Sequence, residues 1–67
     1  MKRQYINLAI DILEALGDVH LQLEVLKKQE GPEWPHIKDT RGRYVATDLL
    51  AAKANLMHSL ALLSTAR

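Results

Sequence analysis

The sequence contains no cysteine, so a disulfide framework and a thiolate metal site are both excluded. It also lacks an unbroken apolar run of the roughly 18 residues that a membrane-spanning helix needs. The basic start, residues 1–4, is followed by apolar residues that Asn7, Asp11 and Glu14 interrupt, unlike the apolar core of a secretion signal. We therefore expect a cytoplasmic protein with no membrane partner.

The composition also lacks the patterns that common functions require. The formal net charge is only +1, so no strong overall field draws the chain to nucleic acid or to anionic lipid. Its three glycines do not form a phosphate-binding loop, and no Ser/His/Asp arrangement or oxyanion-binding motif is present. We therefore expect a protein that is not an enzyme and that needs no cofactor.

A chain of 67 residues forms one domain at most, spanning residues 1–67. A domain this small is marginally stable alone and usually needs a disulfide, a metal ion or a partner chain. Because 48% of the residues are apolar, intrinsic disorder is not the default. With disulfides and thiolate metal sites excluded, oligomerisation is the simplest source of extra stability.

Residues 4–29 predict one long amphipathic helix. Apolar side chains recur at spacings of four and three, the heptad pattern of a helix packed against another helix. Ile6 and Leu13 flank this seam on one side and Leu8 flanks it on the other, so the apolar face is wider than one neighbour covers. The seam consists of Tyr5, Ala9, Ile12, Leu16, Val19, Leu23 and Leu26.

Residues 30–46 are expected to separate this helix from a second one. Gly31, with prolines close behind it, predicts that the helix ends there and that residues 30–36 form a loop. Lysines 27 and 28 precede the break, where cations suit the helix dipole.

A turn is predicted next. Asp39 and Gly42 occupy the first and fourth positions of a type I turn, with β-prone residues on both sides. This pattern favours a very short β-hairpin over residues 37–46. The alternative that the second helix begins earlier, near Thr40, stays open.

The second helix is expected over residues 47–65, with Thr47 as its N-cap and Asp48 in its first turn. Its apolar surface extends around most of the circumference, which one neighbouring helix cannot cover. The fold class is therefore mainly α: an antiparallel helical hairpin that forms a dimeric four-helix bundle. The predicted core and oligomer interface consists of Ile12, Leu16, Val19, Leu23, Leu49, Leu56, Leu60 and Leu63.

The run of residues 39–52 combines a turn with glycine, a short Arg-Tyr-Val segment and an Ala/Leu helix. This run resembles a pattern in small uncharacterised proteins of bacteriophages and actinobacteria, in which the same elements close the chain. The resemblance covers roughly the last half of the sequence. It implies a phage or prophage accessory protein and carries over no catalytic residue.

The titratable side chains form no constellation typical of catalysis or metal binding. The histidines lack the four-residue spacing that places two ligands on one helix face. Three carboxylates of the first helix lie opposite its seam, in a solvated strip. Lys53 falls within the leucine face of the second helix, where we expect its stem to pack and its ammonium to reach water. The histidines are His20, His36 and His58, and the carboxylates are Asp11, Glu14 and Asp18.

The candidate partner-binding site lies between the helices. Trp34 and Tyr44 are two of the three aromatic residues, and Arg41 and Arg43 stand beside them in the sequence. We expect residues 34–45 to form an ordered cap over one end of the bundle, with both arginines projecting into solvent.

Two functions follow from this pattern. The first is a protein-interaction module that self-associates and binds a host or phage protein, because surplus apolar surface often marks a partner site. The alternative is a nucleic-acid-binding accessory factor that uses the basic residues of the loop.

Overall fold

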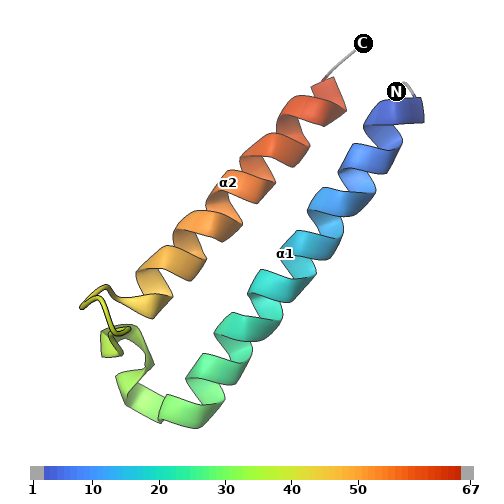
Figure 1. The fold of residues 1–67 in the computed structure, drawn as a ribbon. Helices are drawn as coiled ribbons and strands as arrows, with labels where there is room; N and C mark the ends of the chain where they lie inside the picture. The colour runs from blue at the N-terminus through green and yellow to red at the C-terminus, as the bar shows by residue number, and fades with distance from the viewer. Residues whose placement is uncertain (1–2, 66–67) are drawn as a thin grey trace.

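The computed structural model describes residues 3–65. Over these residues the chain forms two long helices, α1 (Arg3–Glu30) and α2 (Val45–Thr65), joined by a 3-10 helix, η1 (Gly31–His36), and a short loop. The two helices lie side by side and run in opposite directions, so that the start of α1 and the end of α2 meet at one end of the molecule (Figure 1). The predicted helical hairpin is confirmed.

The molecule is one helix long and two helices wide. Its extents are 43 × 19 × 17 Å. The 28 residues of α1 alone span about 42 Å at a rise of about 1.5 Å per residue. Each long helix therefore packs along its length against only the other long helix, and the hairpin is a single layer.

Helix α1 ends where the sequence predicted. Gly31 has a φ of 57°, the left-handed conformation that ends many helices and that glycine adopts without strain. Lys27 and Lys28 lie in the last turn. The helix exceeds the predicted range by one residue at each end.

Packing between the helices follows the predicted seam. All seven seam positions of α1 are buried or half-buried, and Leu49, Leu56, Leu60 and Leu63 of α2 are half-buried as well. The eight residues predicted as core or oligomer interface are therefore partly covered by the facing helix of the same chain. Within the described residues the apolar core is small, since only Leu23 and Ala46 are buried, at 2% and 3% exposure.

The segment expected to be a loop over residues 30–36 is instead helical. Residues 31–36 form η1, which starts directly after α1 and has Pro32 in its first turn. A proline fits there because the first amides of a helix have no acceptor within it and because the fixed φ suits helical backbone. The prolines therefore end α1 without preventing a short, tighter helix.

The predicted β-hairpin is reduced to one isolated bridge, between Lys38 and Tyr44, and the described residues contain no strand. The turn itself is as expected, because the amide of Gly42 donates to the carbonyl oxygen of Asp39 at 3.0 Å. Gly42 has a φ of 78°. Pairing stops after one bridge because Val45, the residue after Tyr44, already begins α2.

Helix α2 begins at Val45, so the predicted cap at Thr47 and the alternative start near Thr40 are both wrong. The amide of Val45 donates to the carbonyl oxygen of Ile37, and the amide of Asp48 donates to that of Tyr44 at 3.2 Å. Backbone acceptors thus satisfy amides of the first turn, and Thr47 lies inside the helix. Asp48 is in the first turn, as predicted.

Candidate interaction surface

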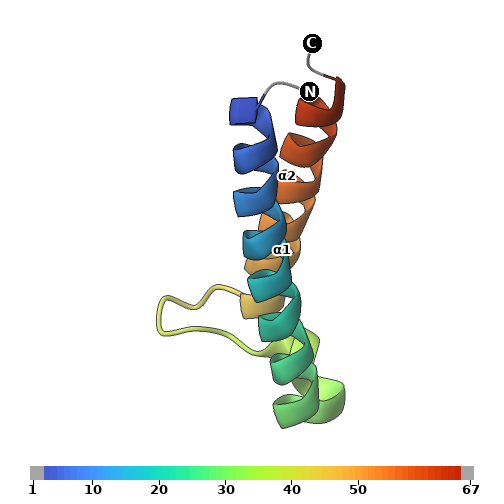
Figure 2. The same ribbon diagram turned by 90° about the vertical axis from the view of Figure 1, so that its right-hand side faces the viewer.

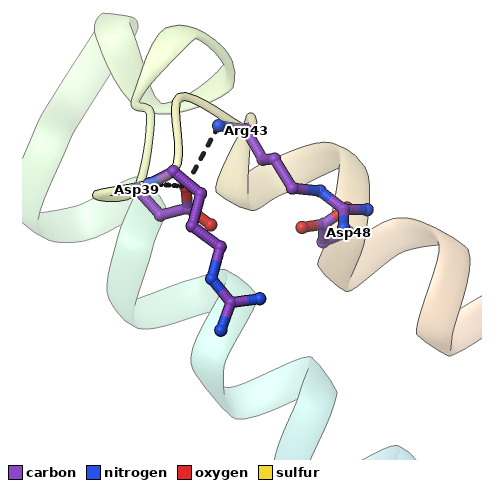
Figure 3. Close-up of polar contacts among 4 residues, drawn as sticks. Asp39, Arg43 and Asp48 are labelled. Atoms are coloured by element: carbon purple, nitrogen blue, oxygen red, sulfur yellow. Dashed lines mark hydrogen bonds and ion pairs between the residues drawn. The ribbon is translucent and has the colours of Figure 1, made fainter.

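The loop between η1 and α2 is ordered by one carboxylate. Oδ1 of Asp39 accepts hydrogen bonds from the amides of Arg41 at 2.8 Å and Arg43 at 3.0 Å. The amide of Asp39 in turn donates to the carbonyl oxygen of Arg43 at 2.8 Å. Figure 3 shows Asp39 at the centre of these contacts. Such an arrangement closes the turn without a longer strand pair.

Most of the basic residues near the loop are engaged within the chain. Nη2 of Arg43 lies 2.9 Å from Oδ1 of Asp48 (Figure 3). The ammonium of Lys38 sits over the Tyr44 ring, 5.1 Å from its centroid. These contacts are solvent-exposed, and an exposed ion pair contributes only about 0–1 kcal/mol.

A similar arrangement holds η1 against α1. The ammonium of Lys27 lies 5.0 Å from the centroid of the Trp34 ring and 3.6 Å from Oε1 of Glu24. Cation–π contacts of this kind contribute about 0.5–1 kcal/mol at exposed sites. Trp34 is half-buried in this position.

The four residues predicted to bind a partner come from two different elements. Arg41, Arg43 and Tyr44 lie on the loop and are exposed, whereas Trp34 belongs to η1. The loop projects to the side of the helix pair and does not cover its end (Figure 2), so the expected cap is wrong in its placement. The bridge between Lys38 and Tyr44 pairs the two ends of this loop with each other, so the loop extends away from the helices.

Large apolar side chains are instead exposed along the helices. Ten of them within residues 3–65 are 43–62% exposed. Nine of the ten belong to α1 or α2, where the facing helix leaves them uncovered. These residues are Ile6, Leu8, Ile10, Leu13, Leu21, Val25, Tyr44, Leu50, Met57 and Leu62.

Many of these side chains gather on one side of the hairpin. At 100° per residue, Ile6, Ile10 and Leu13 all lie to the same rotational side of the α1 seam. Leu50 and Met57 lie to that same rotational side of the α2 seam. Because the helices are antiparallel, equal rotational displacements place side chains on the same side of the pair. We call this surface the hydrophobic face; it consists of Ile6, Ile10, Leu13, Gly17, Leu50, Met57 and Ala61.

Residues of the two helices also meet at the same height on this face. Met57 lies eight residues before the end of α2, or about 12 Å from it, and Ile10 and Leu13 lie about 10 and 15 Å from the start of α1. Those two ends lie together in Figure 1. The hydrophobic face is therefore continuous across both helices. Lys53, half-buried, lies between its two rows, next to the seam. Glu24 has the same rotational position as Ile6, five turns further along α1, and lies at the loop end of the face.

The opposite side of the hairpin is polar. It carries the carboxylates of Asp11 and Asp18 on α1 and the amide of Asn55 on α2, all of them exposed. Leu8 and Leu62 lie on this side near the end where the termini of the two helices meet. Where the two helices overlap, the polar side thus carries two carboxylates, and the hydrophobic face carries the lysine Lys53.

Gly17 lies on the hydrophobic face in the middle of α1. A Cβ at this position would have no neighbour within 4 Å among the described residues outside its own stretch of helix. Glycine costs about 1 kcal/mol relative to alanine inside a helix. No contact within the described chain requires that cost.

The remaining titratable residues stay apart from one another. The three histidines and the three carboxylates of the predicted solvated strip are all exposed, as expected for the carboxylates. Among residues 3–65, no group of three or more metal-ligating side chains comes together. Lys53 forms no ion pair with another described residue. Neither described helix is long and apolar enough to cross a membrane.

Comparison with known protein families, with curated proteins and with solved structures finds no match to this chain. The resemblance of residues 39–52 to small phage and actinobacterial proteins therefore stays a prediction.

Proposed function

We propose that this chain is a small, non-enzymatic protein-interaction module that self-associates through its leucine-rich helices. The observation that carries the proposal is the large surface of the hairpin. The chain exposes 5246 Å², whereas a compact folded monomer of 7.6 kDa exposes about 4300 Å². The excess, about 950 Å², is close to the roughly 800 Å² that each partner buries in a stable protein interface.

The small apolar core also favours self-association. A single layer of two helices leaves the hairpin with very few buried side chains, and the sequence provides no disulfide to compensate. A second copy that covers exposed apolar side chains removes them from water at about 25 cal/mol per Å². A dimer of hairpins, a four-helix bundle, is the simplest assembly that does this.

The test is sedimentation equilibrium of the full chain over a range of micromolar concentrations. We expect a species of about 15 kDa, twice the 7.6 kDa of one chain, that dissociates on dilution. A monomer with a cooperative thermal transition at every concentration contradicts the proposal.

Nucleic-acid binding through the loop is the alternative. The contacts of Lys27, Lys38 and Arg43 within the chain leave few free cations there, which favours the interaction module. Salt-dependent retention of the protein on heparin would reverse this preference. A host or phage protein stays a proposed partner for apolar surface that self-association leaves free.

A further inference from the structure

We infer that the hydrophobic face is the surface on which a second copy of this chain docks, face to face. The inference rests on the proposed self-association and adds which side of the hairpin mediates it. Three observations carry it: the surface excess, the distribution of charge and the position of Gly17.

The surface excess sets the size of the occupant. About 950 Å² of surplus area per chain corresponds to one interface of standard size on each copy. The hydrophobic face offers one continuous surface on both helices, as such an interface requires. In a closed dimer with twofold symmetry, the same surface of each copy is buried once, so no surplus face is left to form a chain of copies.

The charge distribution selects the hydrophobic face over the opposite one. Two copies that met through the polar side would bring Asp11 and Asp18 of one chain toward the same carboxylates of the other, and like charges in an interface are unfavourable. Two copies that meet through the hydrophobic face bring together one lysine from each, Lys53, while Glu24 lies at the loop end of the face. Unlike the short aspartates, the lysine can keep its stem covered while its ammonium reaches the edge of the contact.

Gly17 indicates close contact with another helix. Within the chain, the space beside it is open and its helix loses stability by having glycine there. In the docked pair, the missing Cβ allows a helix of the second copy to approach the α1 backbone. This contact gives the glycine a role that the single chain does not provide.

The hydrophobic face of a second copy can also cover the exposed apolar residues of α2. Leu50 and Met57 are about half-exposed in one chain, and their spacing of seven residues places them in line along α2. Ile6 and Leu13 have the same spacing on α1. Each copy therefore presents two parallel rows of side chains, which can interdigitate with the matching rows of an identical face.

The test compares glutamate variants of exposed apolar residues in the full chain by sedimentation equilibrium. Leu13→Glu and Met57→Glu place a carboxylate on the hydrophobic face, and each should raise the dimer dissociation constant on the order of a hundredfold, because an unpaired charge would be buried. Leu21→Glu and Leu62→Glu, at exposed positions outside the face, are the controls and should change it less than about threefold.

Gly17→Ala tests the same face without adding a charge. The new methyl group should raise the dissociation constant about tenfold by holding the copies apart. Because alanine favours helix, the helix content of the diluted chain should not fall. This variant decides the question if a glutamate variant fails to fold.

The outcomes separate the inference from the proposed function. If the parent chain dimerises and the control variants disrupt the dimer while the hydrophobic-face variants do not, the face is wrong and self-association stands. A Gly17→Ala chain that dimerises as tightly as the parent also overturns the assignment of the face. A parent chain that is monomeric throughout overturns both.

Discussion

Replacing Leu23 with alanine should be the most damaging single truncation in the described chain. Leu23 is 2% exposed and is the only large side chain in the described residues that is buried. Truncating a buried leucine to alanine costs about 2–5 kcal/mol, through lost burial and the cavity that remains. At about 0.05–0.15 kcal/mol per residue, the 67 residues support a total stability of roughly 3–10 kcal/mol. Leu23→Ala should therefore remove a large share of it.

The chain provides a matched control two residues away. Leu21 lies on the same helix but is 62% exposed and points away from α2. Leu21→Ala makes the same chemical change with little loss of burial, so the free energy of unfolding should change by no more than about 0.5 kcal/mol. Because both substitutions are leucine to alanine on one helix, differences in helix propensity cancel.

Urea unfolding of both variants, followed by circular dichroism at one fixed protein concentration, measures this difference directly. Fixed concentration matters because association contributes to apparent stability. If Leu21→Ala destabilises the chain as much as Leu23→Ala does, the seam assigned to α1 is wrong. A loss of less than about 1 kcal/mol for Leu23→Ala would show that burial of this side chain contributes little to the stability of the fold.

Three further perturbations test smaller parts of the structure. Gly42→Val should destabilise the fold by about 1 kcal/mol or more, seen as a lower melting temperature, because a β-branched residue is strained at a φ of 78°. Asp39→Ala removes the acceptor for two loop amides, so hydrogen exchange at those amides should accelerate while the helices keep their protection. Leu16→Ala and Leu56→Ala should each cost less than Leu23→Ala when the chain is dilute, as measured by urea unfolding, because both side chains are only half-buried.

The helices and their contact could be predicted from the sequence because one physical signal determines both. Apolar side chains at spacings of four and three must lie on one side of a helix, and that side must be covered. The seam from Tyr5 to Leu26 therefore identified both the helix and the face that packs on α2. Gly31 marked the end of α1 for an equally local reason, because its positive φ is a property of one residue.

The segment between the helices was harder to predict because its local signals compete. Pro32 suits a loop and the first turn of a short helix equally well, and the structure adopts the helix, with Pro35 inside it. Thr47 is a good N-cap by composition, but the backbone oxygen of Ile37 already satisfies the amide of Val45. That bond depends on the turn before it, which lies outside the pattern of the helix itself.

The hydrophobic face could not be predicted from the pattern of either helix alone. The sequence places Ile6 and Leu13 beside one seam, and Leu50 and Met57 beside the other, but it does not say whether the two flanks meet. Only the antiparallel arrangement of α1 and α2 decides this, since parallel helices would put the same flanks on opposite sides of the pair. The hairpin connection thus turns two separate flanks into one surface. It does so while directing Asp11 and Asp18 to the other side, so the topology that completes the seam also produces the contrast in charge on which self-docking depends.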